Sequence, residues 1–186
     1  MTTAFLVIDM QMGMAERIAS GRALAVPDAE THVADLLALF RGLGAPVIHV
    51  HHDDANPASP FRRGTAGAAA MPCAVPLPGE TVLWKAGSSA FAGTWLDAHL
   101  RKSGIDRLVI AGAVAAFCVT STTRWASDLG FRVILPGDAL LAFDIPAHDG
   151  GRIDAGTVLR VTLSLLGADF AQLVQTDAVA GLLDAA

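Results

Sequence analysis

Three residues of this chain carry side chains suited to covalent or acid–base chemistry, and each follows a short apolar run. Asp9 follows residues 5–8, Lys85 follows residues 82–84, and Cys118 comes soon after the glycine-ended run 108–112. A carboxylate can exchange protons, an ammonium group can stabilise negative charge, and a thiol can attack a carbonyl carbon. Acid, amine and thiol together predict nucleophilic catalysis, provided that the fold brings the three side chains to one place.

Cys118 opens a segment whose pattern indicates a helix. Unpaired N–H groups and the positive end of the helix dipole stabilise a thiolate there, so the position predicts an activated cysteine. Each residue alone has an ordinary alternative: a buried small hydrophobe for Cys118, a turn cap for Asp9 and an exposed loop residue for Lys85. The set of three favours catalysis.

Alternating strands and helices must position these residues. Apolar runs predict six strands, at residues 5–8, 46–50, 81–84, 107–111, 131–135 and 171–176. Helical spacing predicts helices at about 27–42, 94–103, 118–129 and 154–166, and residues after Asp9 are expected to form a loop. This order predicts an α/β fold: a three-layer α/β/α sandwich with a six-stranded, mainly parallel sheet. Ligands bind at the carboxyl ends of such strands, where all three residues are expected.

The connection over residues 52–79 contains five prolines, too many for regular structure. A connection of this length inside a compact domain is usually functional, so we expect it to form a wall or lid over a site.

Composition narrows the class of protein. The 186 residues, about half of them hydrophobic, predict one domain over residues 1–186. The net charge of -5 and the lack of a Lys/Arg run argue against nucleic acid. No apolar stretch approaches the ~20 residues of a membrane span, so we expect a soluble, cytoplasmic protein. Two cysteines, Cys73 and Cys118, without a CxxC pair predict neither a disulfide framework nor a structural zinc site.

Several motifs extend over nearly the whole chain and resemble the isochorismatase-like cysteine hydrolase superfamily, which includes nicotinamidases and N-carbamoylsarcosine amidases. The residues that carry the resemblance are 7–11 (VIDMQ), 84–91 (WKAGSSAF), 93–94 (GT), Leu96, 112–119 (GAVAAFCV), 121–124 (STTR), 128–133 (DLGFRV) and 137–139 (GDA). The order and spacing of the motifs make chance similarity improbable.

The resemblance implies a catalytic role for each of the three residues. Asp9 would be the general base and acid, Lys85 the electrostatic partner, and Cys118 the nucleophile that forms a thioester. The backbone N–H groups of Val114 and Cys118 would form the oxyanion hole, and the Ala113–Val114 peptide would be cis. The family also implies homo-oligomers, dimers or larger, which the high apolar content makes plausible.

The implied activity is hydrolysis of a small amide or related C–N bond without a cofactor. Two alternatives stay open. One is isochorismatase-type hydrolysis of a vinyl ether, and the other is a ligand-binding or redox-thiol protein of the same fold without turnover.

Five residues are candidates for substrate contact. Phe61, Trp84 and Phe91 could supply aromatic surface, and Gln11 could orient the aspartate or touch the substrate. Many relatives have a threonine where Ala115 stands, so the wall beside the nucleophile is expected to be apolar.

The cluster of His49, His51 and Asp53 raises the question of a metal, because nicotinamidases bind one in the corresponding loop. His49 and His51 share one face of the expected strand. The further histidine that completes that site is missing, since no histidine occurs between His52 and His99. We therefore expect no metal, with metal binding by this cluster left as the alternative.

Overall fold

The computed structural model describes residues 2–184 and has a parallel sheet at its centre. Hydrogen bonding joins its strands in the order β3-β2-β1-β4-β5-β9, and a short strand, β6, pairs with β4 outside this path. The strands are β1 (Thr2–Ile8), β2 (Val47–His52), β3 (Thr81–Lys85), β4 (Ile105–Ala113), β5 (Arg132–Pro136), β6 (Leu140–Leu141) and β9 (Gln172–Val174). The six expected strands are thus confirmed, and β6 makes a seventh.

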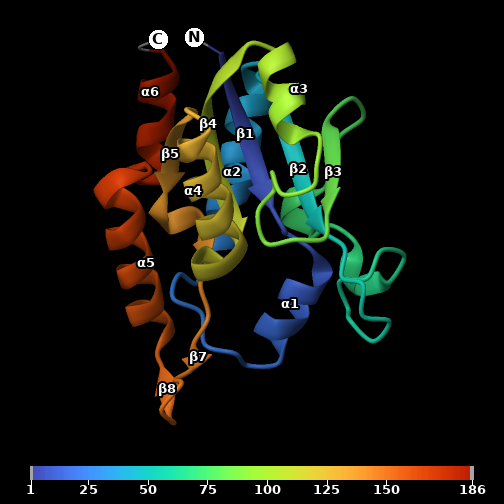
Figure 1. Ribbon diagram of the computed structural model, residues 1–186, viewed down its shortest axis with the longest axis vertical. Helices are drawn as coiled ribbons and strands as arrows, with labels where there is room; N and C mark the ends of the chain where they lie inside the picture. The colour runs from blue at the N-terminus through green and yellow to red at the C-terminus, as the bar shows by residue number, and fades with distance from the viewer. Residues whose placement is uncertain (1, 185–186) are drawn as a thin grey trace.

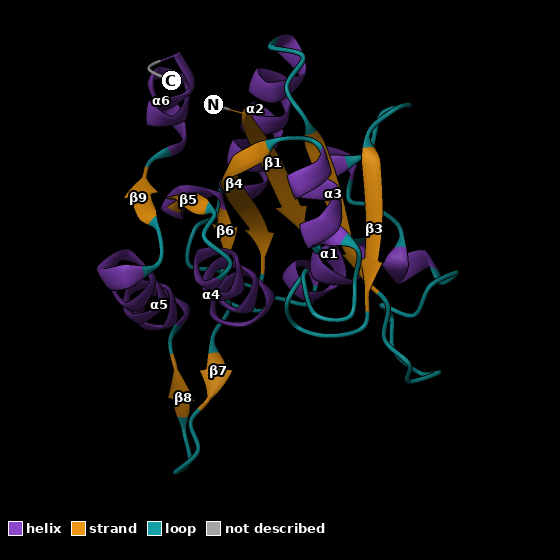
Figure 2. Ribbon diagram, turned by 45° about the horizontal axis from the view of Figure 1, so that its top comes forward, coloured by secondary structure: helices purple, strands orange, loops and turns teal. Residues whose placement is uncertain are grey.

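Helices cover both faces of this sheet. They are α1 (Met12–Ala19), α2 (Ala29–Gly42), α3 (Leu96–Lys102), α4 (Thr120–Asp128), α5 (Ala155–Asp169) and α6 (Val179–Asp184). Figures 1 and 2 show α2 behind the sheet and α3 and α4 in front of it, which confirms the three-layer α/β/α fold. Between residues 2 and 184 we find no helix with the length and apolar character needed to cross a membrane.

The carboxyl ends of the two central strands leave no room for a side chain at Gly112. Ile8 of β1 pairs with Gly112 of β4, whose φ is +115°. A Cβ atom at position 112 would lie 2.2 Å from the carbonyl oxygen of Ile8. Only glycine tolerates both this backbone conformation and this approach. The residue therefore fixes the distance between the segments that leave β1 and β4.

The strand order reverses at β1. From there the chain moves outward to β2 and β3 on one side, and β4, β5 and β9 lie on the other. In open parallel sheets the crevice at such a reversal is the usual ligand site. Asp9 follows β1, Lys85 ends β3, and Cys118 comes just after β4, so all three lie at the same edge of the sheet.

Three elements differ from the sequence-based expectation. The segment after Asp9 is the helix α1 rather than a loop; it contains Gly13 and has no side-chain cap, so the usual helix signals are weak. A small antiparallel hairpin, β7 (Ile145–Pro146) with β8 (Arg152–Ile153), and the last helix, α6, were also not predicted. In Figure 1, α1 and the hairpin lie below the carboxyl ends of the strands.

The connection between β2 and β3 is irregular, as its prolines predict. It contains only two short 3₁₀ turns, Ala66–Ala68 and Pro72–Ala74. Gln11 fixes one part of it: its side chain donates to the carbonyls of His52 and Ala68 and accepts from the His52 N–H. Glu80, at the far end, accepts two hydrogen bonds from Arg41 of α2. The connection is therefore held against the body of the protein.

Candidate active site

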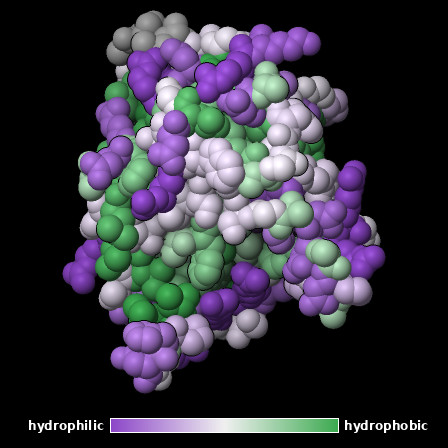
Figure 3. Space-filling model, in the orientation of Figure 1, coloured by the Kyte–Doolittle hydropathy of each residue, from purple (hydrophilic) through white to green (hydrophobic). Residues whose placement is uncertain are grey.

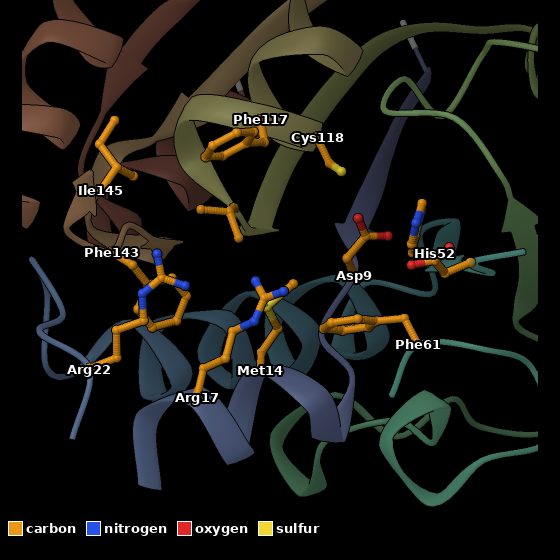
Figure 4. Close-up of a pocket in the computed structure, with 12 residues that line it drawn as sticks. Asp9, Met14, Arg17, Arg22, His52, Phe61, Phe117, Cys118, Phe143 and Ile145 are labelled. Atoms are coloured by element: carbon orange, nitrogen blue, oxygen red, sulfur yellow. The ribbon is translucent and has the colours of Figure 1, made fainter. Parts of the chain in front are cut away.

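A cavity of about 360 Å³ opens at the carboxyl edge of the sheet (Figure 4). Helix α1, the β2–β3 connection, the turn after β4 and the segment before β7 enclose it. Its lining residues are Asp9, Met14, Arg17, Arg22, His52, Asp54, Phe61, Val114, Phe117, Cys118, Phe143 and Ile145. The volume suits a small organic molecule.

The structure brings Asp9, Lys85 and Cys118 together at this cavity. The Lys85 ammonium donates to Asp9 Oδ2 over 2.8 Å and to Cys118 Sγ over 3.3 Å. The carbonyl of Gly87, at 3.2 Å, is a further acceptor. Lys85 and Asp9 are both almost fully buried, and a buried charge pair requires such hydrogen bonding. Lys85 therefore bridges the carboxylate and the thiol.

Asp9 combines an uncommon backbone conformation with a carboxylate oxygen that is free to accept a proton. Its φ of +49° lies in the left-handed region, which is uncommon for a residue other than glycine. While Oδ2 is bound by Lys85, Oδ1 has no hydrogen-bond partner among residues 2–184. A buried carboxylate oxygen without a partner is costly, and it can accept a proton from a neighbouring donor.

Cys118 lies in a π-helical turn, Ala115–Val119, that precedes α4. The Val119 N–H reaches back five residues to the carbonyl of Val114, which is the hydrogen bond typical of a π turn. The Thr120 hydroxyl donates to the carbonyl of Ala115 and satisfies another free group of the turn. The resulting wide turn leaves Cys118 half-buried at the cavity wall.

The activated-thiolate expectation for Cys118 requires correction. Burial of the side chain, followed by the negative charge of Asp9, raises the pKa of the Cys118 thiol to about 12, and Lys85 offsets only part of this. At neutral pH the free protein therefore holds a thiol. A nucleophilic role then depends on removal of the proton during attack, by a base within reach.

His52 is a neighbour of this group that the sequence did not single out for catalysis. It lines the cavity, and its Nδ1 lies 3.4 Å from the Lys85 ammonium. Burial and the charge of Lys85 lower the pKa of His52, so its ring is mainly neutral at neutral pH.

The five candidates for substrate contact separate into two groups. Phe61 lines the cavity, whereas Gln11, Trp84, Phe91 and Ala115 do not. The expectation of substrate contact is therefore corrected for these four residues, which make other contacts. Gln11 holds the β2–β3 connection, and Trp84 packs edge-on against His51 with the Arg63 guanidinium over its ring. Phe91 stacks on Phe131, and Ala115, the first residue of the π turn, is fully buried.

The resemblance implies an oxyanion hole formed by the backbone N–H groups of two residues. Val114 and Cys118 both line the cavity. The Ala113–Val114 peptide is cis, as the resemblance implies.

The other two histidines of β2, His49 and His51, do not line the cavity and contact other residues. His49 Nε2 lies 2.9 Å from Glu80, and His51 packs against Trp84. Burial, then the neighbouring His49, lowers the pKa of His51 to about 4. Among the described residues, no group of three or more His, Cys, Asp or Glu side chains is arranged to hold a metal ion.

Two arginines and one phenylalanine of the lining, Phe143, were missed by sequence reasoning, whereas Phe117 belongs to the wall that was expected to be apolar. Arg17 lies on α1 and Arg22 follows it, in the segment expected to be a loop. Met14 and Arg17, three residues apart, share one face of this helix, a signal that recognition of α1 would have given. Phe117 and Phe143 add apolar walls beside and opposite the thiol.

Comparison with known proteins agrees with this fold and site. Residues 3–152 match the isochorismatase domain. The structure is similar to that of an isochorismatase-family protein from Chromobacterium violaceum, with a TM-score of 0.93 and 35% identity over 100% of this chain and 95% of that one. The chain therefore belongs to the isochorismatase family, and it is a hydrolase.

Two further relatives are named as a hydrolase and as an amidase. Streptothricin hydrolase from Streptomyces noursei is 39% identical over 148 residues, 77% of this chain and 51% of that protein. N-carbamoylsarcosine amidase from Thermoplasma acidophilum has a TM-score of 0.74 and 26% identity, over 95% of this chain and 98% of that one.

Proposed function

We propose that this protein is a cysteine-dependent hydrolase of small amides or related C–N compounds. The observation that carries the proposal is the bridge from Lys85 to both Asp9 Oδ2 and Cys118 Sγ at the edge of the cavity. The names of the streptothricin hydrolase and N-carbamoylsarcosine amidase relatives support amide chemistry. Asp9, Lys85 and Cys118 are the proposed catalytic residues.

The first half of the reaction consumes the amide. As Cys118 Sγ attacks the carbonyl carbon, Asp9 Oδ1 takes the thiol proton, because the high pKa of the thiol prevents ionisation beforehand. Protonated Asp9 then gives this proton to the leaving nitrogen. The C–N bond breaks, ammonia or an amine departs, and a thioester remains on Cys118.

The second half restores the enzyme. Asp9 removes a proton from water, which attacks the thioester carbon. The C–S bond breaks, the acid product leaves, and the sulfur regains the proton from Asp9. Throughout, the Lys85 ammonium stabilises negative charge on both the carboxylate and the sulfur.

The backbone N–H groups of Val114 and Cys118 are the proposed donors to the oxyanion. Their place in the cavity lining supports this role, since a carbonyl carbon in reach of Sγ lies beside the same turn. Fixed donors at such a position lower the barrier because they are already oriented when charge develops.

Ammonia release from a panel of primary amides, ureides and N-carbamoyl compounds tests the proposal. Turnover should vanish in Cys118→Ala and persist in Cys73→Ala, a matched control because Cys73 does not line the cavity. Ammonia release that survives in Cys118→Ala would refute a cysteine mechanism. No release from any compound of the panel would favour vinyl-ether hydrolysis, the alternative chemistry of the family.

We also propose that the protein forms homo-oligomers through the outer face of α5. Val161 and Leu165, one helical turn apart, are about half exposed, and Leu173 of β9, which lies against Gly167 of α5, is also exposed. Figure 3 shows apolar side chains gathered along this side of the molecule. Light scattering should give a mass above one chain, and Leu165→Glu should lower it; a monomeric wild type would contradict the proposal.

A further inference from the structure

One end of the cavity carries a concentration of positive charge that the proposed reaction does not use. We propose that Arg17 and Arg22 form a carboxylate-binding subsite, so that the substrate is a small amide that also bears a carboxylate group. The inference rests on the proposed function, because it defines the substrate class of the same site.

Arg17 has no acidic partner in the part of the chain that the structure describes. Its guanidinium lies over the Phe61 ring, 5.0 Å from the centroid, and its one side-chain hydrogen bond goes to the Met14 sulfur, a weak acceptor. The side chain is half-buried at the cavity. A guanidinium carries five N–H donors, so most of those of Arg17 remain free for a ligand.

Arg22 is held so that its charge also faces the cavity. It donates to the Asp144 carbonyl over 2.8 Å and lies 5.1 Å from the centre of the Phe143 ring. The Asp144 carboxylate is 3.6 Å away, and it is shared with Arg152. Asp144 therefore neutralises Arg22 only in part.

The two guanidinium groups disfavour each other in the absence of an anion. Burial, then the charge of Arg22, lowers the pKa of Arg17, while a negative charge on Cys118 would raise it. Figure 4 shows both groups directed from the α1 side of the cavity toward Phe117. An anion between them would relieve this repulsion and supply the missing acceptors.

The two acidic residues of the cavity lining, Asp9 and Asp54, have other partners than the two arginines. Asp9 is paired with Lys85, and Asp54 accepts a hydrogen bond from the backbone N–H of Asn56 in its own loop. Planar guanidinium groups match a carboxylate with paired hydrogen bonds. Phe117 lies beside Cys118, and Phe143 lies beside Arg22 on the opposite side of the cavity, so apolar surface that suits the carbon skeleton of the substrate is present at both ends.

Paired substrates that differ only in the carboxylate test this subsite. We would compare succinamate with butyramide, glutaramate with pentanamide, and 4-carbamoylbenzoate with 4-methylbenzamide, measuring kcat/KM by ammonia release. The ratio of acid to neutral amide should fall about 10- to 100-fold in Arg17→Gln and in Arg22→Gln, the effect expected for a lost charge-assisted hydrogen bond. Arg160→Gln, an exposed arginine of α5, should leave the ratio unchanged. The inference would be overturned if the wild type hydrolysed the acid and neutral amides equally well. It would also be overturned if Arg17→Gln kept the same acid-to-neutral ratio as the wild type.

Calorimetry separates this inference from the proposed function. If no amide is hydrolysed, the proposed function fails, but binding to the wild-type protein still decides the subsite. Tighter binding of 4-carbamoylbenzoate than of 4-methylbenzamide, lost in Arg17→Gln, would support it. Equal or absent binding of the two would refute it.

Discussion

Replacement of Asp9 by asparagine should make Cys118 easier to alkylate while it abolishes hydrolysis. In the proposed mechanism Asp9 is needed to accept the thiol proton, yet its charge is a main reason, after burial, why the pKa of the Cys118 thiol reaches about 12. Asparagine has the same shape and tolerates the positive φ of position 9. The substitution therefore removes the charge with little change in geometry.

The size of the effect follows from the surroundings of the thiol. Loss of a like charge at about 4–6 Å lowers a pKa by about 1 to 3, and Lys85 still donates to Sγ in the variant. For each tenfold gain in thiolate, the nucleophilicity of that thiolate falls about threefold. The iodoacetamide rate at neutral pH should thus rise about 4- to 40-fold. Hydrolysis should fall about 10²- to 10⁴-fold with the loss of the general base.

Peptide mass spectrometry over a range of pH would measure alkylation of Cys118 and Cys73 in one sample. Cys73 is an internal control, since burial raises the pKa of its thiol to about 11 and it does not line the cavity. A slower alkylation of Cys118 in Asp9→Asn would refute the reasoning, because it would mean that Asp9 helps to maintain a thiolate in the resting protein.

Three further substitutions test how the fold supports the site. Hydrogen bonds from Arg41 hold the pKa of Glu80 at about 2, below its ordinary 4.5, so the stabilisation is complete above pH 4.5 and is lost as the pH falls toward 2. Glu80→Gln removes the negative charge and one of the two oxygens that face Arg41 and His49, so it should lower the free energy of unfolding by about 1–3 kcal/mol at pH 6; in urea titrations the difference should shrink at pH 3, and a constant difference would contradict the assigned pKa. Gln11→Ala should cost about 2–4 kcal/mol, because three hydrogen bonds are lost, two to His52 at the end of β2 and one to Ala68 of the β2–β3 connection; an unchanged urea midpoint would disprove that role. Gly112→Ala should lower stability by more than about 2 kcal/mol and reduce turnover, since the new Cβ has no room beside β1; a thermal melt and kcat like those of the wild type would show that the strands can separate.

The sheet could be predicted because its central strands are continuous apolar runs. β1 and β4 are buried on both faces, which is the burial that such runs indicate. Once the parallel order is known, residues that follow different strands must lie at one edge. Asp9, Lys85 and Cys118 are far apart in sequence and adjacent in the structure for this reason.

Other properties of the site could not be predicted, because local sequence patterns do not contain the contacts that determine them. The pKa of the Cys118 thiol reflects burial and a charge more than a hundred positions away in the sequence. Gln11 has the side chain of a ligand-binding residue, but the β2–β3 connection uses its hydrogen-bonding groups. Arg17 escaped notice because α1 is short and contains Gly13.

Trapping of the acyl-enzyme tests the central claim most directly. The protein would be mixed with an amide that it hydrolyses, quenched in acid within one turnover, and analysed by intact and peptide mass spectrometry. The account predicts a mass increase equal to the acyl group on the peptide that contains Cys118, present in Cys73→Ala and absent in Cys118→Ala together with turnover. Hydrolysis that proceeds without this adduct, and at an undiminished rate in Cys118→Ala, would contradict it.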